Sequence, residues 1–153
     1  MNKNHRTVAR EYALKFMFQW EHNATREAKI KMKNPHDLSI ELQRFDTTYS
    51  ETDPEHPENL LTPAIKEYAM KLINGTYQEE ENLEKILEEN LQKWSVKQLK
   101  KMDSIILKLA LFEIKYLPET PSKVVVNEAI NLAKAYSDEN SYAFINSVLQ
   151  KFI

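Results

Sequence analysis

The sequence predicts an all-α fold, and two observations lead to this prediction. The chain of 153 residues has a single glycine and only six prolines, which are clustered. A β-sandwich or barrel would need turn residues at about every 8–12 positions. Apolar residues recur three or four positions apart in most segments, as on one face of a helix. We therefore expect about seven helices in a single domain that spans residues 1–153.

The first predicted helix runs from Arg6 to Glu21. Its apolar stripe at helical spacing consists of Ala9, Ala13, Phe16, Met17 and Trp20. Phe18 lies off this stripe, on the side that also carries Thr7, Glu11 and Leu14. Such an aromatic residue either packs against the following segment or contacts a ligand, and both interpretations stay open.

The middle of the chain predicts a short helix, a loop and two longer helices. The short helix spans Leu38–Phe45, and the acidic residues 46–62 are expected to form a mobile loop. Pro63 suits the first turn of the next helix, which we expect to end or hinge at Gly75. The helix after it has one apolar face, and nearly all of its opposite face is glutamate. Its apolar face consists of Leu83, Ile86, Leu87 and Leu91.

Three more helices are predicted after residue 94. The stretch "MDSIILKLALFEIKYL" at 102–117 is apolar on several sides, which predicts the central helix. The stretch 122–136 begins with three β-branched valines close together, but its apolar residues then recur at helical spacing, so we predict one helix with Ser122 as N-cap. The last helix is expected to be capped by Asp138 or Ser141.

The net charge of −2 conceals a division along the chain. Residues 1–33 carry a net charge of +5, residues 34–93 carry −9, and residues 94–153 carry +2. Basic ends suggest a polyanionic partner, and the acidic middle suggests a solvated or repelling surface. Charges that simply solvate helix faces would give the same pattern, so this alternative stays open.

Composition also constrains the compartment. The chain has no cysteine, which excludes disulfides and thiolate metal sites and fits a reducing compartment. The N-terminal residues lack the apolar core of a signal peptide, and no apolar run approaches the roughly 18 residues of a membrane span. We therefore expect a cytoplasmic protein without a membrane partner.

The sequence does not predict a catalytic or metal site. The histidines lie far apart, without the spacing of metal ligands, at His5, His22, His36 and His56. No glycine-rich phosphate loop or nucleophile elbow can be formed with one glycine. We predict no enzymatic activity, no cofactor and no metal.

A few polar residues fall on apolar helix faces, and each could belong to a site. They are Glu113, Asn127, Glu128 and Asn146. Buried polar groups need hydrogen-bond partners, and such partners are available where two helices meet. We favour this structural interpretation over a functional one.

Four blocks of sequence carry a resemblance to a known family. They are "AREYALKFMFQW" at 9–20, "MDSIILKLALFEIKYL" at 102–117, "KVVVNEAINLAKAY" at 123–136 and "FINSVLQ" at 144–150. In order and spacing they resemble the NusB family of bacterial transcription antitermination factors, over nearly all of the chain except residues 23–62. The combination is highly specific, whereas each block alone is only a helix pattern.

The resemblance implies an all-helical fold of two packed three-helix sub-bundles without enzymatic activity. It also implies binding to the boxA element of nascent ribosomal or phage RNA, together with the small-subunit ribosomal protein NusE. This complex joins the elongating RNA polymerase and acts in rRNA transcription. We keep a homodimer as an alternative to a monomer.

Site residues follow from the resemblance position by position. Phe18 takes the place of a tyrosine in the family's RNA-facing helix, and "HRTVAR" keeps two arginines of an arginine-rich run. Ala143 and Ser147 replace a lysine and a glycine that many members have, which would either weaken RNA binding or place more of it on other lysines, including Lys100. The expected protein-partner contact is Asp103. The expected RNA-binding residues are Lys3, Arg6, Arg10, Phe18, Lys97 and Lys101.

Two other functions stay open. The chain could be an RNA-binding domain related to that of Sun-type rRNA cytosine methyltransferases, which also begin with a NusB-like domain. That interpretation requires a glycine-rich cofactor domain, which residues 1–153 do not contain. The chain could instead be a protein-only helical interaction module that docks through its acidic residues 34–93 and has no RNA affinity.

Overall fold

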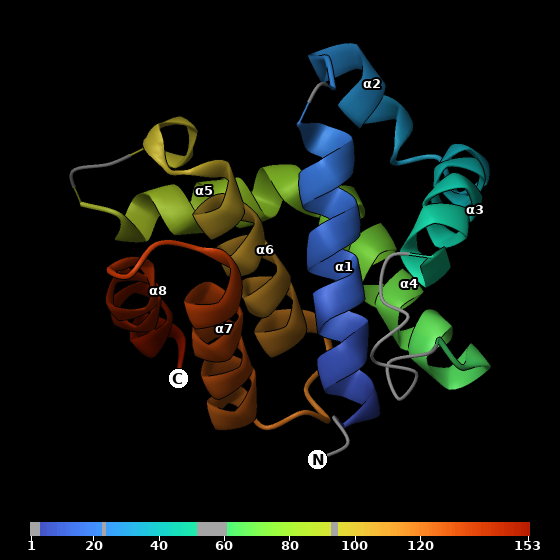
Figure 1. The fold of residues 1–153 in the computed structure, drawn as a ribbon. Helices are drawn as coiled ribbons and strands as arrows, with labels where there is room; N and C mark the ends of the chain where they lie inside the picture. The colour runs from blue at the N-terminus through green and yellow to red at the C-terminus, as the bar shows by residue number, and fades with distance from the viewer. Residues whose placement is uncertain (1–3, 23, 52–60, 93–94) are drawn as a thin grey trace. The chain divides into compact units, whose positions relative to one another are not determined.

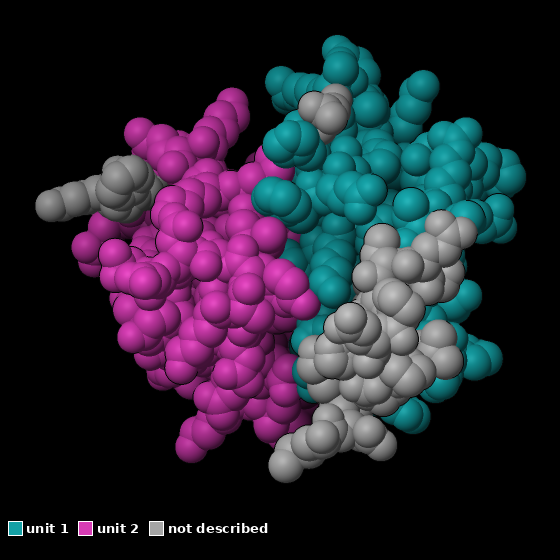
Figure 2. All heavy atoms as spheres, viewed as in Figure 1, with its two compact units in different colours: residues 1–78 teal, residues 79–153 magenta. Residues whose placement is uncertain are grey.

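The computed structural model describes residues 4–22, 24–51, 61–92 and 95–153. In these ranges every regular element is helical, with eight α-helices and two short 3₁₀ helices (Figure 1). The chain divides into two compact units, which we call the first unit, residues 1–78, and the second unit, residues 79–153 (Figure 2). The predicted all-α class with two helical sub-bundles is confirmed. None of the described helices is long and apolar enough to cross a membrane.

The described residues of the first unit form four α-helices. Asn4 precedes the first of them as its N-cap, and the Asn4 side chain accepts a hydrogen bond from the Arg6 N–H at 2.8 Å. Thr25 caps the second helix in the same way, through the Ala28 N–H at 3.1 Å. These caps satisfy backbone donors that a helix start leaves free. The helices are α1 (His5–Glu21), α2 (Arg26–Lys31), α3 (Pro35–Glu51) and α4 (Pro63–Gln78).

Helix α1 packs along α4 and is buried on more sides than its apolar stripe predicts. Leu14, which lies off the stripe, is fully buried. Phe45 of α3 packs edge-on against the rings of Tyr12 and Phe16, with centroid distances of 5.2 and 5.4 Å. Both α3 and α4 therefore pack against α1.

Helix α3 is longer than predicted, so residues 46–51 are helical and do not begin a loop. The Asp46 carboxylate accepts a hydrogen bond from the Tyr12 hydroxyl and lies 3.4 Å from the Lys66 ammonium of α4. The Thr47 and Thr48 hydroxyls donate to carbonyls of the preceding turn. These contacts hold the polar end of the helix in place. The rest of the predicted loop, residues 52–60, lies outside the described residues.

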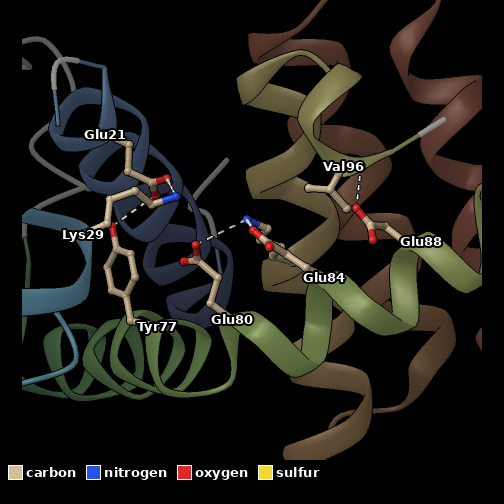
Figure 3. A network of polar contacts seen from close by, with 8 residues as sticks. Glu21, Lys29, Tyr77, Glu80, Glu84, Glu88 and Val96 are labelled. Carbon is tan, nitrogen blue, oxygen red and sulfur yellow. Dashed lines mark hydrogen bonds and ion pairs between the residues drawn. The ribbon is translucent and has the colours of Figure 1, made fainter. Parts of the chain in front are cut away.

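We expected α4 to end or hinge at Gly75. The predicted end is wrong, because the helix continues to Gln78, and a hinge stays a prediction. Tyr77, two positions after the glycine, stabilises the last turn of the helix. Its side chain is buried, and its hydroxyl donates to the Glu21 carboxylate at 3.1 Å. The ammonium of Lys29 on α2 lies 3.1 Å from the same carboxylate (Figure 3). This packing outweighs the low helix propensity of glycine.

The second unit is built around α6, as predicted for the central helix. Every residue of α6 from Asp103 to Glu113 is buried, and α5, α7 and α8 pack against it. The elements are α5 (Glu80–Asn90), η2 (Val96–Gln98), α6 (Lys101–Tyr116), α7 (Ser122–Tyr136), α8 (Ser141–Leu149) and η3 (Gln150–Phe152).

A lysine lies in the interior of this unit. Lys108 of α6 is 4% exposed, and its ammonium lies 2.7 Å from the Glu84 carboxylate and 3.7 Å from that of Glu80. Both carboxylates project from α5 (Figure 3). An unpaired charge in the interior would cost several kcal/mol. Two glutamates of α5 therefore neutralise the charge of Lys108.

The predicted caps of α7 and α8 are wrong. Pro121 is the N-cap of α7, and Ser122 is the first helical residue. Asn140 is the N-cap of α8, and the Ser141 hydroxyl donates to the Asp103 carboxylate of α6. In both cases the serine lies one position inside the helix, and the buried carboxylate of α6 determines where the Ser141 hydroxyl points.

We predict that Gly75→Ala stabilises the protein. Gly75 lies inside α4, and no glycine of the described chain has a positive φ, so an alanine can take this conformation. The free energy of unfolding should rise by about 0.4–1 kcal/mol, measured by urea denaturation. Ala64→Gly at an exposed position of the same helix is the matched control and should lower it. A loss of stability in Gly75→Ala would show that this position needs glycine.

Candidate nucleic-acid interface

The two arginines of α1 contact one aromatic ring on α4. The Arg6 Cζ lies 4.8 Å from the centroid of the Tyr68 ring, and the Arg10 Cζ lies 6.0 Å from it. The arginines are four positions apart and thus occupy one side of the helix. A cation–π contact contributes about 0.5–1 kcal/mol when exposed and about 2 kcal/mol when desolvated. The Tyr68 ring therefore restrains both guanidinium groups.

The two arginines differ in exposure. Arg10 is only 6% exposed, whereas Arg6 is half-buried, and the first turn of α1 contains no acidic residue. A guanidinium needs access to solvent to meet an RNA phosphate. Arg6 therefore keeps access to solvent, whereas Arg10 is buried. Phosphate contact by either arginine stays a prediction.

The ring of Phe18 is partly accessible. Phe18 is half-buried, and its ring centroid lies 6.2 Å from that of the exposed His22, with the planes tilted by 43°. Glu11 and Leu14 on the same side of α1 are buried, whereas Thr7 and Phe18 are half-buried. Stacking on an unpaired base requires an accessible ring of this kind. A role in RNA binding stays a prediction.

The predicted lysines fall into separate parts of the chain. Lys3 lies outside the described residues. Lys97 on η2 and Lys101 at the start of α6 are exposed, and the Lys100 ammonium between them pairs with the Asp138 carboxylate. The structure thus gathers Lys97, Lys100 and Lys101 on the second unit, whereas Arg6 belongs to the first.

Asp103 points into the second unit. It is 6% exposed, and its carboxylate accepts hydrogen bonds from the Ser137 hydroxyl at 2.6 Å and from the Ser141 hydroxyl at 3.0 Å. The two hydroxyl oxygens lie 2.9 Å apart. These three residues form the Asp103 cluster. It holds the corner between α7 and α8, residues 137–141, against the start of α6. Direct contact between Asp103 and a protein partner stays a prediction.

Sequence analysis missed Tyr68, Ser137 and Ser141 as members of these arrangements. Tyr68 falls on the apolar stripe of α4, where an aromatic residue is expected to be core, so local spacing gives no signal that two arginines contact it. The sequence indicates only a helix cap for Ser141 and gives no signal for Ser137. Both partnerships join residues far apart in the chain, at separations of 34 and 38 positions for the serines.

The other polar residues singled out in the sequence fit a structural interpretation only in part. Glu113 is 1% exposed, Asn127 is exposed, and the Asn146 side chain accepts a hydrogen bond from Gln150 at 3.0 Å. Within the described ranges, no three His, Cys, Asp or Glu residues are grouped so that they could hold a metal ion.

Comparison with known proteins identifies the family. The NusB family model matches residues 7–153. The chain belongs to the NusB family. It is 38% identical over 134 residues to the transcription antitermination protein NusB of Clostridium novyi, covering 86% of this chain and 98% of that protein. The NusB of Macrococcus caseolyticus is 36% identical over 148 residues, covering 97% and 95%. The family consists of non-catalytic transcription antitermination factors.

Solved structures of NusB proteins share the fold. T. maritima NusB superposes with a TM-score of 0.70 at 23% identity, covering 99% of this chain and 92% of that one. The NusB–NusE complex with dsRNA contains a chain with a TM-score of 0.70 at 24% identity, covering 97% and 95%. The NusB fold thus extends over both units.

We predict that Phe18→Ala weakens RNA binding more than folding. Loss of a stacked base should cost about 1–3 kcal/mol of RNA affinity. The free energy of unfolding should fall by less than the roughly 3–5 kcal/mol expected for a core phenylalanine. Phe16→Ala, at a 1% exposed position of the same helix, is the matched core control. Thermal melts and RNA titrations measure both quantities. A large loss of stability with unchanged affinity per folded molecule would exclude stacking by Phe18.

We predict that Ser141→Ala destabilises the second unit by about 1.5–3 kcal/mol, because a buried carboxylate loses a hydrogen bond. Ser147→Ala at an exposed position of the same helix should change the free energy of unfolding by no more than about 0.5 kcal/mol. Urea denaturation of both variants provides the comparison. Equal stability of the two variants would show that the Asp103 cluster contributes nothing.

Proposed function

We propose that this chain is an RNA-binding adaptor of transcription antitermination that acts in the cytoplasm. It binds boxA-type single-stranded RNA together with the ribosomal protein NusE, within the RNA polymerase elongation complex. The observation that carries this proposal is the contact of Arg6 with the Tyr68 ring, 4.8 Å from Cζ to centroid, on the helix that also bears the partly open ring of Phe18.

The chemistry of these two residues suits single-stranded RNA. Such RNA is bound by cations that meet phosphates and by aromatic rings that stack on unpaired bases. Because the Tyr68 ring restrains Arg6, less side-chain entropy is lost when the guanidinium meets a phosphate. Buried Arg10 supports this arrangement from beneath, and the exposed Lys97 and Lys101 add phosphate contacts on the second unit.

The partner assignment is supported by the matched structure in which NusB, NusE and dsRNA form one complex. We propose that Asp103 contributes to NusE binding through the corner that it holds. Its carboxylate is occupied by the Ser137 and Ser141 hydroxyls, so exposed residues of the corner would make the direct contacts.

One titration tests the proposal. Labelled boxA-type RNA and a scrambled RNA of equal length are titrated with the chain alone and with added NusE. We expect boxA-type RNA to bind more tightly than scrambled RNA, and NusE to strengthen that preference. Absence of RNA binding in both conditions, or equal binding of the two RNAs with NusE present, would overturn the proposal.

We predict that RNA affinity falls linearly with salt on a double-logarithmic plot, by a slope of about 0.7 for each phosphate contact. Arg6→Gln should reduce the slope by about one such contact. Lys71→Gln, which removes an exposed lysine from α4 in the same unit, is the control and should leave the slope unchanged. Equal slopes for wild type and Arg6→Gln would remove Arg6 from the interface.

A further inference from the structure

We infer that the first unit carries a pocket between α1 and α3 that binds an arginine side chain from a basic segment of a protein partner. This inference goes beyond the proposed RNA-binding function. The pocket has a volume of about 320 Å³, at the small end of the range for ligand sites, which suits a single side chain. Phe16 and Trp20 of α1 and Glu41, Arg44 and Phe45 of α3 line it.

The walls of the pocket are aromatic and held in place. Phe16 and Phe45 are buried, and their rings meet edge-on with 5.4 Å between centroids. The half-buried ring of Trp20 contacts the Tyr77 ring of α4 edge-on, with a centroid distance of 6.3 Å. Because these rings are already positioned, little ordering is needed when a ligand binds. Among aromatic rings, tryptophan attracts a cation most strongly.

The rim of the pocket offers a carboxylate that is only partly used. The Glu41 Oε1 accepts a hydrogen bond from the Arg44 Nη1 at 3.0 Å, and neither side chain has another polar partner among the described residues. The Arg44 side chain is 73% exposed, and an exposed ion pair of this kind contributes little stability. An incoming guanidinium can therefore bond to the second carboxylate oxygen or replace Arg44 altogether.

The charge of α3 favours a cation. Residues 35–51 carry four acids, Asp37, Glu41, Asp46 and Glu51, against one base, Arg44, so their net charge is −3. An acidic ligand would find one arginine on a helix that otherwise repels it.

The shape of the pocket favours arginine over lysine. A guanidinium is flat, so it can stack on the Trp20 indole while its N–H groups donate to the Glu41 carboxylate. An ammonium can pair with the carboxylate, but it is a compact charge without a plane that could stack.

The pocket and Phe18 lie on opposite sides of α1. At 100° per residue, the Phe18 side chain points about 160–200° away from those of Phe16 and Trp20. RNA stacked on Phe18 would therefore leave the pocket open. The chain can thus hold RNA and an arginine of a protein partner at the same time.

The test follows the indole N–H signal of Trp20 in the full chain by NMR, assigned through its loss in Trp20→Phe. The probe is an acetylated and amidated peptide of alternating glycine and arginine, with four arginines. Two comparison peptides carry lysine or the uncharged analogue citrulline in place of arginine. We expect the arginine peptide to shift the signal, the lysine peptide to bind several-fold more weakly and the citrulline peptide not to bind.

Two variants of the rim should change this affinity in opposite directions. Glu41→Gln should weaken binding of the arginine peptide by about 10- to 100-fold, as expected for loss of a charged hydrogen bond. Arg44→Gln should strengthen binding by about two- to fivefold, because it removes the competing guanidinium. Glu67→Gln, at an exposed position of α4, removes the same charge from the same unit and should leave the affinity unchanged.

Several outcomes would overturn the inference. Equal binding of the arginine peptide by wild type and Glu41→Gln would do so, and so would weaker binding in Arg44→Gln. Equal binding of the arginine and lysine peptides would reduce the pocket to general charge attraction. Loss of affinity for boxA-type RNA in Glu41→Gln would assign the pocket to RNA instead. If wild type binds no RNA but binds the peptide as expected, the proposed function fails and this inference stands.

Discussion

The second unit depends on how a buried helix accommodates its charges. Helix α6 is buried from Asp103 to Glu113, and this stretch also includes Lys108. Charge in the interior is tolerated only where it is paired and hydrogen-bonded. Lys108 therefore requires carboxylates from α5, and Asp103 requires hydroxyls from the corner between α7 and α8. The buried charges of α6 therefore determine which side chains α5, α7 and α8 must place against it.

The first unit meets a similar constraint around α1. Arg10 and Glu21 are both buried there, and each has an aromatic partner on α4, Tyr68 and Tyr77. Arg6, which we propose to contact RNA, lies at the edge of this cluster. It contacts the same Tyr68 ring as Arg10 and keeps access to solvent. In the first unit, the ring that pairs with buried Arg10 thus also holds Arg6, which we propose to contact RNA.

Local periodicity was enough to predict the helices whose burial follows one stripe. The predicted bounds of 122–136 agree with α7, where Val125 and Val126 are buried and Val124 is 43% exposed, as a helix requires and a strand does not. The end of α3 could not be predicted, because Asp46 is held by Tyr12, 34 positions away. The same limit applies to the site. Phe18 can be identified from its place off the stripe, whereas Asp103 meets Ser137 and Ser141 only after α7 and α8 pack against α6.

The central claim is that both units contribute to one RNA-binding function, and hydrogen–deuterium exchange tests it most directly. Exchange would be followed with and without saturating boxA-type RNA. The account predicts slower exchange of backbone amides at the start of α1 and around Phe18, and also over η2 and the start of α6, which carry Lys97 and Lys101. Protection confined to the glutamate-rich face of α5, or unchanged exchange at both predicted places while RNA is bound, would contradict it.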